Sequence, residues 1–189
     1  MLFRSSTYHG CIFVRKDSRI KSSKDMQGKR MAFVDKATTA GYIFPVAYLK
    51  DNGVLDIKKF FKETYFTGSH DAAISYVLDR KADIGAAKNT IYDRVRKENP
   101  RIDKELEILA ESAKVPSNGL CVRKGLDKKI KKKLKEALLG LDKDPEGKAV
   151  LEKFGAIKFI ETTFVDYKPV FDLSQKAGIN LKNYKYKNQ

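Results

Sequence analysis

The sequence predicts an α/β domain with a largely parallel sheet, and three observations support this class. Short apolar runs alternate with longer helical stretches over much of the chain. Three such runs, at 31–34, 60–66 and 83–87, each lead through a turn of small or polar residues into a helix. The length of 189 residues suits one domain, or a domain with an appendage.

The remaining elements follow in order along the chain. The first strand is expected at 10–16, and Ser23 is a plausible cap for a polar turn that Gly28 ends. Helices are expected after the three apolar runs, at 42–51, 71–80 and 90–98. Two more strands are expected at 106–111 and 119–124. The rest is expected to be helical, at 127–140, from Asp144 and Pro145 onward, and at 166–177.

The strong positive charge makes nucleic acid the first partner to consider. The formal net charge is +15, but lysine (30) far exceeds arginine (9), the residue favoured for base reading and for bidentate contacts with phosphate. The densest lysine run, at 128–135, keeps its apolar residues on one helical stripe, so its lysines form a solvated face. We therefore expect no nucleic-acid partner.

The residues that carry most enzyme chemistry are scarce. The chain has only two cysteines and two histidines, so few residues could form a metal site or a Ser-His-Asp triad. Asp35 and Asp71 lie at the turns after the apolar runs, but neither has an obvious catalytic partner. No glycine-rich nucleotide loop is present. We therefore expect neither an enzyme nor a bound metal or cofactor.

Candidate binding residues lie at the three equivalent turns, which a parallel sheet would bring to one edge. Thr38, Thr39, Ala40 and Gly41 offer hydroxyls and accessible N–H groups at a helix start, a combination that suits an oxyanion. His70 stands at the second helix start, and Lys88 and Asn89 follow the third strand. The alternatives are N-capping by either threonine, an idle exposed histidine and an ordinary surface lysine.

Two segments share an apolar-apolar-Val-Arg-Lys pattern, at 12–16 and 120–124. They bracket the α/β block, so they are either a coincidence or the two strands by which the chain enters and leaves one lobe. On the second interpretation Cys11 and Cys121 would lie close together. A disulfide between them is possible but not favoured, because the register is unknown.

Several of these segments together resemble the phosphate/phosphite/phosphonate-binding proteins of ABC importers. The resemblance rests on motifs that occur in the right order over nearly the whole chain. They include Val14-Arg15-Lys16-Asp17-Ser18, Gly28-Lys29-Arg30-Met31-Ala32-Phe33-Val34-Asp35, Thr38-Thr39-Ala40-Gly41-Tyr42, Gly68-Ser69-His70-Asp71-Ala72, Ala82-Asp83-Ile84-Gly85-Ala86 and Leu109-Ala110-Glu111-Ser112. Such a protein has a two-lobed periplasmic-binding-protein fold and binds a small phosphorus oxyanion, here with Tyr8 added to the candidate ligand-binding residues.

The resemblance also implies a division of the chain. Residues 1–16 would hold a hinge strand and a remnant of the first lobe, 17–117 the ligand-closing second lobe, and 118–189 the return strand and C-terminal helices of the first lobe. On the order of a hundred further residues would precede Tyr8 in a family member. The apolar stripes of the helices from 127 onward, including Ile130 and Leu134, are then expected to be partly exposed or to pack against another copy.

The implied partners are an oxyanion and an ABC permease in the membrane, and the implied location is the periplasm or the cell envelope, although the sequence shows no signal peptide. The family's turn usually reads Ser/Thr-Thr-Ser-Gly, so Ala40 lacks one hydroxyl, and Lys88 is a cation. Both differences favour phosphate, phosphite or a simple alkylphosphonate. The alternative is the ligand-sensing domain of a membrane signalling receptor with the same fold.

Overall fold

The computed structural model describes residues 7–186, which form two compact units. The larger unit contains Tyr8–Val115 and the chain from Lys168 onward, and the smaller contains Pro116–Tyr167 together with Thr7. In the larger unit, strand β2 (Gly10–Arg15) therefore belongs with the residues expected for the second lobe, and so does helix α8 (Lys168–Lys176). The expected division into lobes at 16–17 and 117–118 stays a prediction.

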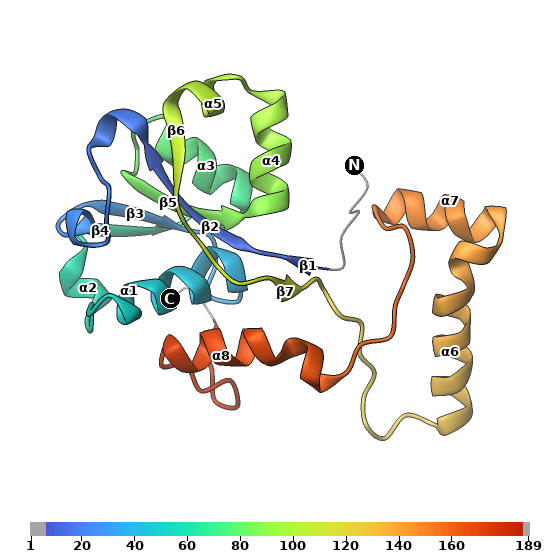
Figure 1. Ribbon diagram of the computed structural model, residues 1–189. Helices are drawn as coiled ribbons and strands as arrows, with labels where there is room; N and C mark the ends of the chain where they lie inside the picture. Colours follow the sequence, from blue (N-terminus) through green and yellow to red (C-terminus); the bar gives the residue numbers. More distant parts are fainter. Residues whose placement is uncertain (1–6, 187–189) are drawn as a thin grey trace. The chain divides into compact units, whose positions relative to one another are not determined.

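A five-stranded sheet forms the centre of the larger unit (Figure 1), with the order β4-β3-β5-β2-β6. Its other strands are β3 (Arg30–Phe33), β4 (Glu63–Phe66), β5 (Ile84–Lys88) and β6 (Leu106–Glu111). Strand β3 pairs in parallel with β4 and β5, whereas β2 is antiparallel to both β5 and β6. Four strands thus run in one direction and β2 runs in the other, so the expected largely parallel sheet is confirmed.

Helices cover both faces of this sheet. The residues of β2 alternate between them, with Ile12 and Val14 in one hydrophobic cluster and Cys11 and Phe13 in the other. The first cluster includes residues of helix α1 (Phe44–Asp51) and of α8, and the second includes residues of α3 (His70–Leu78), α4 (Asn89–Glu98) and α5 (Arg101–Glu105). This period-2 alternation in a strand buried on both faces places β2 at the centre of the core.

The segment between α1 and β4 differs from the prediction. We expected a strand from Phe60, but the short helix α2 (Ile57–Phe60) precedes the shorter strand β4. The Asp56 side chain accepts hydrogen bonds from the backbone N–H groups of Lys58 and Lys59, at 3.0 and 3.3 Å, and so caps this helix. An N-terminal cap therefore decides the local structure against the β propensity of the aromatic run.

The strand expected at 119–124 is wrong. The chain instead leaves the larger unit through β7 (Val115–Pro116), which pairs with β1 (Thr7–Tyr8) in a two-stranded sheet. Residues 119–124 form no strand, and Leu120 and Val122 are exposed. Pro116 has no backbone N–H to donate to a longer ladder, which is a physical reason for the short pairing.

The expected placement of Cys121 on a strand is therefore wrong as well. Both cysteines are free thiols; Cys11 is buried in the five-stranded sheet, where its Sγ donates to the Ala87 carbonyl oxygen at 3.3 Å, and Cys121 is exposed.

The smaller unit is helical, as expected. It contains α6 (Lys128–Gly140) and α7 (Pro145–Phe154). Asp127 caps α6 by accepting from Lys129 N and Ile130 N, and Asp144 caps α7 by accepting from Gly147 N. Between 116 and 167, only Gly147 and Leu151 are buried among the described residues. The described part of the chain contains no helix with the length and apolar composition that a membrane crossing requires.

Candidate functional site

The 38–41 turn, composed of Thr38, Thr39, Ala40 and Gly41, connects β3 to a helix. The backbone bends sharply after Asp35, whose carbonyl oxygen accepts from Thr38 N at 2.9 Å and from Thr38 Oγ1 at 2.6 Å. A π-helical turn, η3 (Thr39–Ile43), then continues into α1. The first N–H groups of this helix have no acceptor within the helix and lie at the positive end of its dipole. The turn therefore has the backbone geometry of an anion site.

The two threonines of this turn have different surroundings. Thr38 occupies the N-cap position, but its side chain makes no capping bond, because its hydroxyl donates to the Asp35 carbonyl oxygen. The N-capping interpretation is therefore wrong for Thr38. Within residues 7–186, the Thr39 hydroxyl has no hydrogen bond to another residue. Thr39 is thus the side chain in the turn whose hydroxyl can donate to a ligand without first breaking an internal bond.

Ala40 and Gly41 keep the turn tightly packed. A Cβ atom on Gly41 would lie 2.5 Å from the Val34 side chain and 2.8 Å from Thr38 Oγ1, so only glycine fits there. Ala40 is 3% exposed. It lies against Gly10, where a Cβ atom would come within 3.1 Å of the Ala40 Cα. The beginning of β2 thus supports the helix start from one side.

The second turn, after β4, is connected to the first. Thr67 N and Gly68 N donate to the carbonyl oxygens of Phe33 and Val34, at 2.9 Å in both cases, so the ends of β3 and β4 stay side by side. Ser69 then caps α3 by accepting from Ala72 N at 3.1 Å. This cap places His70 at the first position of the helix, at the same edge of the sheet.

His70 is bonded to the third turn. Its Nδ1 accepts a hydrogen bond from the backbone N–H of Lys88 at 3.2 Å, which assigns the ring proton of the neutral form to Nε2. Burial lowers the pKa of His70 to about 4, and the positive charge of Lys88 contributes to this shift against the opposing effect of Asp71. At neutral pH the ring is therefore an uncharged donor rather than an idle exposed side chain.

Lys88 and Tyr8 form a pair at the end of β5. The Lys88 Nζ lies 4.2 Å from the centre of the Tyr8 ring, within the range of a cation–π interaction. Burial lowers the pKa of Lys88 from its usual value. Lys88 is also the register partner of Gly10, which contacts Ala40.

Asn89 has a structural bond of its own. Its backbone N–H donates to the His9 carbonyl oxygen, and its Oδ1 accepts from His9 N, both at 3.0 Å. The amide oxygen therefore holds the chain between β1 and β2, while the side-chain NH₂ group keeps its two donors. All three turns lie at the carboxyl edge of the parallel strands, as expected. Lys88 contacts both His70, by a hydrogen bond, and Tyr8, by a cation–π interaction. That these residues bind a ligand stays a prediction.

Two further residues at this edge were not predicted. His9 Nε2 lies 3.2 Å from a carboxylate oxygen of Glu111, at the end of β6. The Thr90 hydroxyl, in the first turn of α4, is buried and has no hydrogen-bond partner in the part of the chain that the structure describes. No sequence pattern marks either one, because both roles depend on which strands become neighbours.

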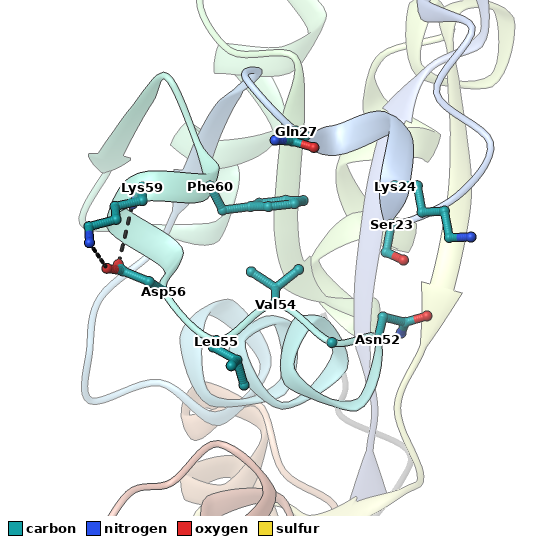
Figure 2. A pocket seen from close by; sticks show the side chains of 10 residues that line it. Ser23, Lys24, Gln27, Asn52, Val54, Leu55, Asp56, Lys59 and Phe60 are labelled. Atoms are coloured by element: carbon teal, nitrogen blue, oxygen red, sulfur yellow. Dashed lines mark hydrogen bonds and ion pairs between the residues drawn. The ribbon is translucent and has the colours of Figure 1, made fainter.

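One hollow among the described residues lies elsewhere. It has a volume of about 520 Å³ and is lined by residues that precede β3 and β4, including Ser23, Lys24, Val54 and Phe60 (Figure 2). These segments lie at the amino ends of the parallel strands, opposite the three turns. Lys59 also lines this hollow, and its Nζ is 3.8 Å from Asp56 Oδ2. Ligands of parallel sheets bind at the carboxyl ends, so we do not assign the site here.

Residues 7–186 contain no group of three or more histidine, cysteine, aspartate or glutamate side chains that could hold a metal ion. The donors at the three turns are hydroxyls, amides, a neutral imidazole and an ammonium group. This set suits an anion.

Comparison with known proteins finds similarity to phosphonate- and phosphite-binding proteins. A family model described as "ABC transporter, phosphonate, periplasmic substrate-binding protein" matches residues 3–167. The chain is 30% identical over 167 residues to the "Probable ABC transporter phosphite binding protein PhnD1" of Prochlorococcus marinus (strain MIT 9301), covering 85% of this chain and 56% of that protein. It is 26% identical over 174 residues to the phosphonates-binding periplasmic protein of Escherichia coli (strain K12), covering 90% and 51%. The chain thus spans about half the length of these relatives.

Solved structures give the same fold. The structure of PhnD1 from Prochlorococcus marinus in complex with methylphosphonate matches with a TM-score of 0.75 and 26% identity, over 94% of this chain and 70% of that chain. XAC2383 from Xanthomonas citri, bound to ATP, matches with a TM-score of 0.80 and 24% identity, over 94% and 68%. The expected periplasmic-binding-protein-like architecture is confirmed.

Proposed function

Since the chain belongs to the periplasmic phosphonate-binding proteins of ABC transporters, a family of substrate receptors and not of enzymes, we propose that it binds a small phosphorus oxyanion at the carboxyl edge of its sheet. The ligand class is phosphonate, phosphite or phosphate. In this proposal the protein acts in the periplasm or anchored to the cell envelope, and it delivers the ligand to an ABC permease in the membrane.

The observation that carries this proposal is the 38–41 turn. It combines uncompensated N–H groups at a helix N-terminus, the Thr39 hydroxyl and a glycine that lets the backbone pack closely. The relatives support the ligand class, because their names refer to phosphite and phosphonates, and one related structure contains methylphosphonate.

The second and third turns add donors of complementary character. His70 offers a neutral Nε2–H and Lys88 offers a positive charge, and the two residues are linked by the bond between Lys88 N and His70 Nδ1. These groups are all donors, and the unprotonated oxygens of a phosphorus oxyanion accept hydrogen bonds from them. Charge-assisted hydrogen bonds of this kind are about twice as strong as neutral ones.

The test is isothermal titration calorimetry of the chain with phosphite, phosphate and methylphosphonate, comparing Thr39→Val with the original sequence. Loss of one charge-assisted hydroxyl donor should weaken the affinity for the preferred anion about tenfold or more. Thr64→Val is the matched control, because Thr64 is exposed on β4, at the edge of the sheet. Equal affinities of Thr39→Val and the original chain would refute the assignment of the turn, and no binding of any of the three anions would refute the ligand class.

A further inference from the structure

Lys88 is the cationic side chain that the fold places among the candidate binding residues. It ends β5, pairs in register with Gly10, and its backbone N–H is bonded to His70. Gly10 in turn contacts Ala40 of the 38–41 turn. One residue of β2 therefore lies between the lysine and the proposed anion turn. This placement follows from the antiparallel pairing of β2 with β5, and it does not depend on the side-chain rotamer.

The position of the Lys88 ammonium group is defined by an aromatic ring. Its Nζ lies 4.2 Å from the centre of the Tyr8 ring, and the lysine is only partly exposed. A cation held over a ring in a partly desolvated position exerts a stronger field than a mobile surface lysine. The half-buried state also agrees with the lowered pKa of Lys88, which burial causes.

The acidic side chains of the same edge already have partners. Asp71, at the start of α3, forms an ion pair with Arg94, and Glu111, at the end of β6, pairs with His9 at 3.2 Å. The Asp35 carboxylate accepts from Ala37 N at 2.7 Å within its own turn. A ligand ammonium group would therefore compete with existing bonds for a carboxylate, and it would also face a fixed positive charge.

We propose that Lys88 determines the substrate class, so that the site accepts phosphorus oxyanions without a cationic group and rejects aminoalkyl phosphonates. This inference rests on the proposed function, because it concerns the same site. Phosphite, phosphate and methylphosphonate carry negative charge and no ammonium group, so the lysine attracts them. An aminoalkyl phosphonate places a second cation near Lys88, and such a repulsive element is an effective way to obtain specificity.

The experiment compares methylphosphonate with 2-aminoethylphosphonate by titration calorimetry on the 189-residue chain. We expect the original chain to prefer methylphosphonate by about tenfold or more. Lys88→Met, which retains much of the length of the side chain without its charge, should bind methylphosphonate more weakly and reduce the preference at least about fivefold. Lys88→Arg should keep the preference, and Lys88→Glu should shift it towards the aminoalkyl ligand.

Lys81 offers a matched control. Its Nζ also lies over a tyrosine ring, 5.6 Å from the centre of Tyr76, but Lys81 precedes β5 and so lies at the opposite edge of the sheet. Lys81→Met should leave the preference unchanged. Circular dichroism establishes that each variant is folded, and Lys88→Gln replaces Lys88→Met if the latter is not.

The outcomes separate the inference from the proposed function. Equal affinity of the original chain for both phosphonates would overturn the role of Lys88 without any variant. A preference for methylphosphonate that persists in folded Lys88→Met would also overturn the role of Lys88. In both cases, binding of methylphosphonate would still support the proposed function. If the original chain binds none of the oxyanions, the proposed function fails and the inference fails with it.

Discussion

Gly10 lies against Ala40 so closely that a Cβ atom at position 10 would be 3.1 Å from the Ala40 Cα and 3.3 Å from its carbonyl oxygen. The same atom would be 2.7 Å from Cδ1 of Phe44. Two segments that are distant in the sequence thus define the position of one helix N-terminus. The proposed anion turn is therefore supported by the central strand as well as by its own hydrogen bonds.

Gly10→Ala should displace the start of this helix. Backbone atoms cannot move aside as a flexible side chain can, so we expect a loss of about 1–3 kcal/mol in the free energy of unfolding, together with weaker anion binding. Chemical denaturation and calorimetry measure the two effects. At Gly125 an added Cβ would meet nothing within 4 Å, so Gly125→Ala is the control and should be nearly neutral. A Gly10→Ala variant with unchanged stability would contradict the close contact.

Thr38→Val should mainly reduce stability. The Thr38 hydroxyl donates to the Asp35 carbonyl oxygen at 2.6 Å, and valine removes this bond while it preserves the shape of the side chain. We expect a loss of about 1 kcal/mol in the free energy of unfolding, measured by urea denaturation. Thr38→Ser, which retains the hydroxyl, should restore most of it. If Thr38→Val leaves stability intact but abolishes anion binding, the Thr38 hydroxyl belongs to the ligand and not to the turn.

Stability should fall as the pH drops from about 6.5 to about 4, because of His70. An unfolded histidine takes up a proton near its ordinary pKa of 6.5, whereas burial lowers the pKa of native His70 to about 4. Between these values the unfolded state binds more protons than the native state, so acidification favours unfolding. After allowance for the partial exposure of the ring, His70 should lower the free energy of unfolding by on the order of 2 kcal/mol over this pH range.

The measurement is urea denaturation of the chain at several pH values in this range. His70→Asn is the comparison, because its amide oxygen can accept the Lys88 N–H and it does not titrate. The variant should lose much of the slope between pH 6.5 and pH 4. Identical slopes for both proteins would show that His70 is not the group responsible.

The isolated 189-residue chain should self-associate in solution. The smaller unit has little core, and it exposes large apolar side chains, including Ile130, Leu134, Phe154 and Phe164. Exposed apolar patches of this kind are uncommon on soluble monomers and usually find a partner. Light scattering over a range of concentrations should therefore report a mass above that of a monomer.

A double variant, Ile130→Gln with Leu134→Gln, should reduce this association because it removes two exposed apolar side chains of α6. Leu55→Gln is the control, since Leu55 is a single residue of the larger unit that is 87% exposed. A monomer at all concentrations would show that the exposed side chains of the smaller unit do not drive association.

Much of the fold can be predicted from the sequence because local signals and tertiary packing agree. The helix after Asp144 begins where its capping aspartate predicts, since the carboxylate satisfies an N–H group that the helix itself cannot. The strand–turn–helix order also predicts that the turns after β3, β4 and β5 meet at one edge. The resemblance to the family, however, depends on several motifs in the right order, because no single motif is specific.

The prediction was wrong where secondary structure depends on pairing with neighbouring strands. Residues 120–124 carry the same pattern as 12–16, but only the first copy lies between two strands, and the second has no ladder to join. An isolated strand is not stable in water, so composition alone cannot decide between the copies. The pairing of Lys88 with Tyr8 and the bond from Lys88 to His70 are likewise tertiary, and no spacing predicts them.

The central position of β2 has a consequence for the synthesis of the protein. Its neighbours emerge from the ribosome much later, since Cys11 bonds to Ala87, 76 residues onward, and Gly10 bonds to Ser112, 102 residues onward. Closing such long loops is costly in entropy and slows folding. Until β6 has been translated, the fully buried strand β2 lacks one of its two neighbouring strands. The nascent chain should therefore be most vulnerable to aggregation, and most in need of chaperones, before β6 is complete.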